Sequence, residues 1–179
     1  MLSFALDAGA EDIRYVRLGS NLLTLIGTPL QVGKIIPKVT LSDESMNLVS
    51  TESLKGTVTI LSVVPSIDTA VCEKQTHILS EKNGDLDITV RLITVSRDLP
   101  FAQNRFKREA KTTNLTYLSD YREASFGKAT GLLIAENGLL TRAVIVLDAE
   151  SIVRYLEVVP NLGQLPQMEN AFKFARSLL

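Results

Sequence analysis

Residues 60–76, ILSVVPSIDTAVCEKQT, hold the only cysteine of the chain, Cys72, and an apolar run that passes directly into a polar turn and a helical pattern. Residues 60–64 are short, apolar and rich in β-branched side chains, which predicts a buried strand. Pro65 is expected to end that strand, because proline has no N–H to give to a sheet. The spacing then predicts a helix over residues 71–79 that runs on to about Lys82.

The position of Cys72 within this stretch has a chemical consequence. Ser66, Asp68 and Thr69 supply turn and cap chemistry just before the helix, so the thiol falls in its first turn. A helix N-terminus carries partial positive charge and free N–H groups, which favour the reactive thiolate. The alternative is that Cys72 is only a small buried apolar residue, because free cysteine is among the most buried residue types.

Length and composition limit the class of protein. The 179 residues are 45% hydrophobic, which suits one domain, 1–179, with a substantial core. A net charge of -1 gives no support for a nucleic-acid binder, and no apolar run is long enough for a membrane span. The N-terminus does not resemble a secretory signal. One cysteine forbids an internal disulfide and a multi-thiolate zinc site. These observations favour a protein of a reducing compartment, which we expect to be the cytoplasm.

The order of the remaining patterns predicts an α/β fold. Strands at 57–64 and 87–95 flank the helix that carries Cys72 and are therefore expected to lie parallel, as neighbours or near neighbours. Further elements are expected as a hairpin at 13–26, helices at 100–111, 121–128 and 165–179, and a late hairpin of strands 139–147 and 152–159. A thioredoxin-like mixed β-sheet flanked by helices, extended by an N-terminal β-hairpin, fits this order.

Four segments in the same order resemble one protein family. The stretch VVPSIDTAVCEKQT has the spacing P-x-x-x-T-x-x-C and is similar to the active-site segment of the peroxiredoxins, in particular their bacterial thiol peroxidase branch. The segments DLPFAQNRF (98–106), LSDYR (118–122) and GLLTRAVIVLD (138–148) also resemble that branch. The likeness extends from about Leu18 to the last predicted helix, so it is far more specific than a bare T-x-x-C.

The resemblance implies a role for each matched residue. Cys72 matches the peroxidatic cysteine, which attacks a peroxide and becomes a sulfenic acid. Thr69 matches the hydroxyl that bonds the thiolate and the peroxide, and Pro65 matches the residue that shields the pocket. Arg142 matches the arginine that stabilises negative charge on sulfur and oxygen, a task that suits a permanently charged guanidinium.

Each of these residues also has a simpler explanation. Thr69 could be only a helix cap, and Pro65 only a strand terminator. Arg142 opens an apolar strand and could lie at its solvated rim. His77, the only histidine, is five residues beyond Cys72 and well round the helix from the thiol, so we interpret it as a surface or packing residue.

One departure from the family pattern concerns the resolving cysteine, which relatives usually carry in the segment PFAQ-x-RFC. Here the segment is PFAQNRFKRE, with Lys107 at that position. With no second cysteine, an intramolecular disulfide is impossible, and an external thiol reductant must complete the cycle: thioredoxin, glutaredoxin or a low-molecular-weight thiol.

Two functions follow as hypotheses. The first is a thiol-dependent peroxidase that reduces hydrogen peroxide and organic hydroperoxides through Cys72, Thr69 and Arg142. The second is a redox sensor or binding protein that keeps the fold without efficient turnover. A cysteine hydrolase is a distant third, because Cys72 and His77 lack plausible triad geometry. The resemblance further implies a homodimer, and the sequence shows no cofactor-binding or metal-binding motif.

Overall fold

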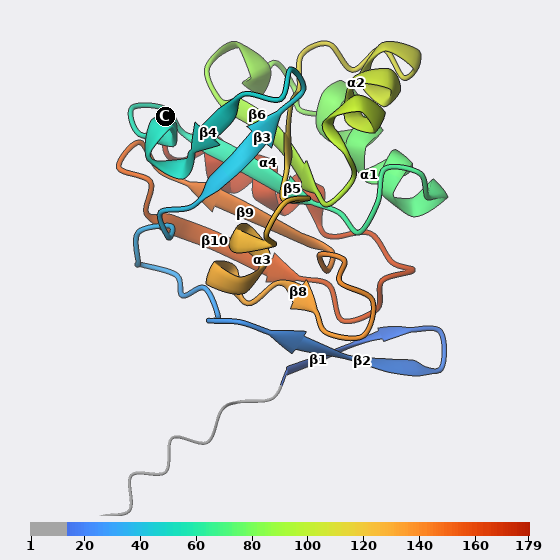
Figure 1. Ribbon diagram of the computed structural model, residues 1–179. Coiled ribbons are helices and arrows are strands. Elements are labelled where there is room, and N and C mark those ends of the chain that lie inside the picture. The colour runs from blue at the N-terminus through green and yellow to red at the C-terminus, as the bar shows by residue number, and fades with distance from the viewer. Residues whose placement is uncertain (1–13) are drawn as a thin grey trace, which may run out of the picture.

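The computed structural model describes residues 14–179 and has an α/β architecture (Figure 1). Its main sheet has seven strands in the order β10-β9-β5-β6-β7-β3-β4. The strands of this sheet are β3 (Thr40–Asp43), β4 (Leu48–Ser50), β5 (Thr59–Val63), β6 (Arg91–Ser96), β7 (Thr116–Ser119), β9 (Ala143–Leu147) and β10 (Val153–Val158). The helices are η1 (Thr51–Leu54), α1 (Ala70–Glu81), η2 (Leu86–Ile88), α2 (Pro100–Glu109), α3 (Ser125–Thr130) and α4 (Met168–Arg176), where η marks a 3-10 helix. None of these helices is long and apolar enough to cross a membrane.

The centre of the main sheet is parallel and its edges are antiparallel. Strand β5 pairs in parallel with β6, and β6 with β7, as expected for strands joined by helical crossovers. Strand β9 pairs antiparallel with β5 and with β10, which confirms the predicted late hairpin. Every residue of β5 and β9 is buried, so these two strands form the middle of the core.

Helices cover both faces of this sheet, as predicted. One face packs against α1 and α4 in a core that contains Cys72, Leu79, Phe172 and Ala175, with α2 touching it through Ala102 and Phe106. The other face is covered by α3 and by connecting segments, with Phe126 fully buried against the sheet. This arrangement of layers is visible in Figure 1.

The N-terminal hairpin forms a second, smaller sheet. Strands β1 (Arg14–Leu18) and β2 (Asn21–Ile26) pair antiparallel as predicted. The other edge of β2 pairs antiparallel with the two-residue strand β8 (Leu133–Ile134). Figure 1 shows this sheet below the main one. Gly27, which follows the hairpin, adopts φ +103°, and a Cβ there would overlap the carbonyl oxygen of Lys128. Only glycine allows this close approach of two backbones.

The structure corrects several predicted boundaries. The strand predicted at 139–147 begins only at Ala143. The strand predicted at 87–95 begins only at Arg91, because Asp85 is left-handed and Leu86–Ile88 coils into η2, leaving Ile88 79% exposed. The helix predicted at 121–128 is shifted to α3, where the buried Asp120 accepts bonds from the N–H groups of its first turn. The last helix starts at Met168 and not at 165, because Gln167 has a ψ of 70°, outside the helical range, and is the N-cap residue. Residue 13 of the predicted first hairpin lies outside the described residues.

Candidate active site

The strand, turn and helix predicted at residues 60–76 are present and bury the thiol. Strand β5 ends at Val63, and the buried Pro65 follows as the chain leaves the sheet. Thr69 is the N-cap residue of α1, and Cys72 is the third helical residue. The Cys72 side chain is fully buried, in the core between α1 and the sheet. The sulfur therefore lies in the first turn of a helix and away from bulk water.

Arg142 comes to this sulfur because of the sheet register. It precedes β9, and β9 runs antiparallel to β5 with Ala143 opposite Val63. The end of β5 and the start of β9 are therefore neighbours, although they are far apart in sequence. The Nη2 atom of Arg142 donates a hydrogen bond of 3.3 Å to the Sγ atom of Cys72. Arg142 is only 2% exposed, so the alternative that it lies at a solvated rim is wrong.

Neutral acceptors hold the rest of the guanidinium. Its Nε and Nη2 atoms donate to the carbonyl oxygen of Leu162, at 3.1 and 2.9 Å, and its Nη1 atom donates to Oε1 of Gln75 at 2.9 Å. None of the hydrogen bonds that Arg142 makes within residues 14–179 goes to a carboxylate. A buried cation without an anion is costly, and among the hydrogen-bond partners of Arg142 within residues 14–179 the Cys72 sulfur is the one that can carry a negative charge.

Gln75 is a site residue that the sequence analysis missed. It is fully buried on α1, and its Nε2 atom donates to Oγ of Ser62 in β5 at 2.8 Å. Its amide therefore links the strand to Arg142 and is fixed at both ends. A signal was available: Gln75 lies three residues after Cys72, which places both on the same helix face, and a polar residue on a core-facing position requires a partner.

Thr69 occupies the cap position without using its side chain as a cap. Its backbone is extended, with φ −117° and ψ 143°, but its hydroxyl makes no capping bond. The hydroxyl instead donates to the carbonyl oxygen of Ser66 at 3.1 Å and lies on the exposed side of the turn. The structure thus brings Cys72 and Arg142 into direct contact and leaves Thr69 hydrogen-bonded within the preceding turn.

A second missed residue, Asp98, joins this turn to the end of β6. Its carboxylate accepts hydrogen bonds from Oγ of Ser66 at 2.7 Å and from the N–H of Ile67 at 2.9 Å. Both donors lie between Pro65 and Thr69, so Asp98 is bonded to the segment that leads to the thiol. The adjacent Leu99 is 52% exposed and lies at the surface beside it.

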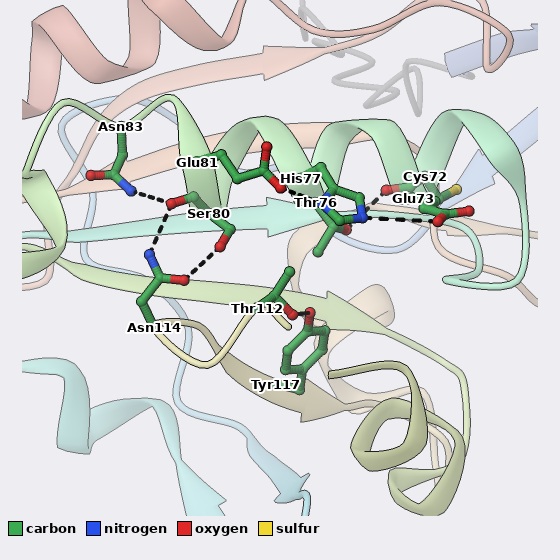
Figure 2. A network of polar contacts seen from close by, with 10 residues as sticks. All are labelled: Cys72, Glu73, Thr76, His77, Ser80, Glu81, Asn83, Thr112, Asn114 and Tyr117. Carbon is green, nitrogen blue, oxygen red and sulfur yellow. Dashed lines mark hydrogen bonds and ion pairs between the residues drawn. The ribbon is translucent and has the colours of Figure 1, made fainter. Parts of the chain in front are cut away.

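His77 takes no part in this constellation, in agreement with its interpretation from the sequence. Its ring lies between Glu73 and Glu81 on the surface of α1, at 3.8 and 2.7 Å. Figure 2 shows these contacts, and the contact that it draws to Cys72 runs from the Thr76 hydroxyl to the backbone carbonyl of Cys72, at 2.9 Å. The histidine is bonded to carboxylates and not to the thiol, so it is not placed to act as a base.

Lys107, at the position of the usual resolving cysteine, is packed into the structure. Its Nζ atom lies 3.0 Å from Oε1 of Glu44 and 6.0 Å from the ring centroid of Tyr117. Burial raises the pKa of Tyr117 to about 12, and its hydroxyl shares a 2.6 Å hydrogen bond with Thr112. This position therefore holds an ion pair over a buried aromatic ring.

Comparisons with known proteins place the chain in a family. The Redoxin family matches residues 31–172. The thiol peroxidase of Halalkalibacterium halodurans is 42% identical over 159 residues, which cover 89% of this chain and 95% of that protein. A peroxiredoxin-like protein from Aquifex aeolicus has a similar structure, with a TM-score of 0.86, 33% identity, and coverage of 93% of this chain and 98% of the other. The thiol peroxidase from Chromobacterium violaceum has a TM-score of 0.83 at 25% identity, covering 93% and 97%.

Proposed function

The chain belongs to the Redoxin family, and from this premise we propose that it is a thiol-dependent peroxidase with Cys72 as its nucleophile. The similar peroxiredoxin-like and thiol peroxidase structures cover 93% of the chain, which supports the proposal that residues 1–179 form one catalytic domain. The substrates are hydrogen peroxide and organic hydroperoxides, and a thiol supplies the electrons.

The first half of the reaction uses the buried site. The Cys72 thiolate attacks the terminal oxygen of the peroxide, an S–O bond forms, and the O–O bond breaks. Sulfur loses two electrons and becomes a sulfenic acid, while the other oxygen takes a proton and leaves as water or an alcohol. Arg142 stabilises the thiolate and the charge that develops on the leaving oxygen. Thr69 donates its hydroxyl to the peroxide, and Pro65 shields the sulfur from solvent.

The observation that carries this proposal is the bond between Arg142 and Cys72. Both side chains are buried, and the guanidinium donates to the sulfur at 3.3 Å while neutral groups fill its other positions. A guanidinium is permanently charged, so the negative sulfur is the missing counter-charge in this pocket. A purely structural cysteine has no need of such a partner.

The second half of the reaction needs an external thiol. A thiol of the reductant attacks the sulfenic sulfur, releases water and forms a mixed disulfide, and a second thiol then frees Cys72 as a thiol. Lys107 stands where relatives usually have a resolving cysteine, and the sequence contains no other cysteine. We propose thioredoxin, glutaredoxin or a low-molecular-weight thiol as this reductant, in the reducing environment of the cytoplasm.

We also propose that the protein is a homodimer with a contact beside the active-site loops. Leu99 and Phe101 support this, because they are 52% and 68% exposed next to the turn that Asp98 holds. Two adjacent exposed apolar side chains favour a contact with another surface.

Peroxide consumption in the presence of a thiol tests the proposed function. Wild-type protein is mixed with hydrogen peroxide or an organic hydroperoxide and with dithiothreitol, glutathione or a thioredoxin system, and Cys72→Ser is the control. We expect many turnovers for the wild type and background consumption for the variant. Mass spectrometry should detect sulfenic acid without reductant and a reduced thiol with it. Wild-type consumption equal to that of Cys72→Ser would refute the proposal.

A redox sensor remains the second candidate, favoured by the absence of a second cysteine from the sequence. The same assay separates the two functions. A sensor would oxidise once at Cys72 and stay oxidised with every reductant, whereas a peroxidase continues to consume peroxide.

A further inference from the structure

Asp98 connects two segments that are distant in the sequence. Its two carboxylate oxygens accept from Oγ of Ser66 at 2.7 Å and from the N–H of Ile67 at 2.9 Å. These donors belong to the turn between β5 and α1, whereas Asp98 follows the end of β6. Hydrogen bonds to an ionised carboxylate are stronger than bonds between neutral groups, so this is a firm attachment.

Asp98 is itself held on a rigid part of the sheet. Its N–H donates to Oγ of Ser96, the last residue of β6, at 3.3 Å, and its carbonyl oxygen accepts from the hydroxyl of Ser119 in β7. The buried Gln103 donates to the same Oγ of Ser96 at 3.0 Å. Strands β6 and β7 pair at this end, Ser96 opposite Ser119. The sheet therefore fixes the position of the Asp98 carboxylate independently of the turn between β5 and α1.

Ser66 connects the Asp98 carboxylate to Thr69 and to the first turn of α1 through hydrogen bonds. Its carbonyl oxygen accepts from the Thr69 N–H at 3.3 Å and from the Thr69 hydroxyl at 3.1 Å. The carbonyl oxygen of Thr69 in turn accepts from the N–H of Glu73 at 2.9 Å, a bond in the first turn of α1. A displacement of Ser66 would therefore move both the Thr69 hydroxyl and the helical turn that contains Cys72.

We propose that Asp98 is a positioning residue for peroxide reduction that acts through Ser66 on Thr69 and Cys72. The inference rests on the proposed function, because it assigns a role within the same reaction. Asp98 touches neither the sulfur nor the peroxide in this role. Its effect is geometric, since a displacement of about 1 Å at a reacting group can cost roughly a hundredfold in rate.

The test compares Asp98→Ala with Asp68→Asn. Asp68 lies in the same turn, is exposed, and has its carboxylate 3.7 Å from Arg105, so Asp68→Asn also removes a negative charge while keeping the Ser66 and Ile67 bonds to Asp98. We expect Asp98→Ala to slow Cys72 oxidation by hydrogen peroxide about 30- to 100-fold, and Asp68→Asn to stay within about twofold of wild type. A melting curve of each variant establishes that it is folded at the assay temperature.

Alkylation of Cys72 by iodoacetamide separates geometry from thiol reactivity. In Asp98→Ala, Arg142 keeps its own bonds to Gln75 and Leu162 beside the thiol, and alkylation does not use the Thr69 hydroxyl, so we expect Cys72 to be alkylated as fast as in wild type or faster. A parallel fall in peroxide oxidation and in alkylation would show that the thiolate itself is lost, and it would overturn the positioning role. A peroxide rate for Asp98→Ala within twofold of wild type would also overturn it.

The double variant Ser66→Ala, Asp98→Ala tests the route. If Asp98 acts through Ser66, the double variant should be oxidised within about twofold of the rate of Asp98→Ala. If the loss of rate in the double variant equals the product of the losses in Ser66→Ala and Asp98→Ala, Asp98 does not act through Ser66. Should Asp98→Ala fail to fold, Asp98→Asn replaces it: the amide keeps one acceptor, and we expect about a tenfold loss with the same criteria. A slow wild-type protein would refute the proposed function itself, whereas a fast wild type with a fast Asp98→Ala variant overturns only the role of Asp98.

Discussion

The two halves of the site, the arginine and the threonine, are built differently. Arg142 is buried, and its guanidinium is bonded to the sulfur, to Gln75 and to the carbonyl of Leu162. Thr69 is exposed, and its hydroxyl is bonded to Ser66 in its own turn. The contact between Arg142 and the sulfur, which we propose to stabilise charge there, is therefore already formed without a peroxide. The Thr69 hydroxyl, which we propose to donate to the peroxide, is instead bonded to the carbonyl oxygen of Ser66 at 3.1 Å and would have to leave that bond to reach a substrate.

Replacing Arg142 should give the largest effect of a single change in the preformed half. Arg142→Met removes the charge and the donor together, and we expect oxidation of Cys72 by hydrogen peroxide to slow at least about a thousandfold. Arg142→Lys retains a charge but loses the planar fork, so it should fall between the methionine variant and wild type. Stopped-flow measurement of thiol loss checks both. A methionine variant within tenfold of wild type would contradict the importance of the buried cation.

Removing the hydroxyl in the exposed half should cost less. Thr69→Val keeps the size and branching of the side chain, and loss of one donor to the peroxide should slow oxidation about a hundredfold. Thr69→Ser restores the hydroxyl and should recover most of the rate. Equal rates for the valine and serine variants would contradict the proposed role of Thr69, because the hydroxyl would then have no part in the reaction.

Removing Gln75 or Ser62, which orient the Arg142 guanidinium, should slow the reaction less. Gln75→Leu removes the acceptor of Nη1 but leaves the Leu162 carbonyl, so we expect roughly a tenfold loss in the peroxide rate. Ser62→Ala frees the other end of the amide and should cost about threefold. If Ser62 acts through Gln75, the double variant should match Gln75→Leu alone. Equal rates for Gln75→Leu and wild type would show that Leu162 suffices to orient the guanidinium.

Replacing Tyr117, whose ring packs against Lys107, should leave the rate of Cys72 oxidation by peroxide unchanged and alter only the stability of the fold. Burial raises the pKa of Tyr117 from 10.0 to about 12, so the folded state prefers the neutral phenol. This contribution to stability is complete below pH 10 and is lost as the pH rises through 12. Tyr117→Phe cannot ionise but lacks the hydrogen bond to Thr112, which costs about 1 kcal/mol. Denaturant titrations should therefore find the variant less stable at pH 8 and the difference shrinking toward pH 12; a difference that is constant with pH would contradict this.

Much of the site followed from the sequence because its central part is local. The apolar run, Pro65 and the helical pattern are adjacent in the chain, so the strand, the turn and the place of Cys72 could be predicted from residue preferences alone. The arginine was expected only from the family resemblance. Its burial and its contact with the sulfur depend on the pairing of β5 with β9, which sets Val63 opposite Ala143 and which no local pattern encodes.

The missed residues and boundaries depend on tertiary contacts in the same way. Asp98 is a polar loop residue in the sequence, and only the adjacent ends of β5 and β6 bring it to the turn before α1. The predicted strand at 87–95 was too long because its first residues alternate like a strand. The left-handed Asp85 and the bond from the N–H of Val90 to the carbonyl of Leu86 coil them instead.

The rate constant for oxidation of wild-type Cys72 by hydrogen peroxide tests the central claim most directly. Stopped-flow mixing of reduced protein with peroxide, in the absence of any reductant, isolates the step at the sulfur. The buried pairing of Cys72 with Arg142 predicts a rate at least about a thousandfold above that of free cysteine, equivalent to about 4 kcal/mol of transition-state stabilisation. A rate equal to that of free cysteine would contradict the assignment of Cys72 as a peroxidatic nucleophile.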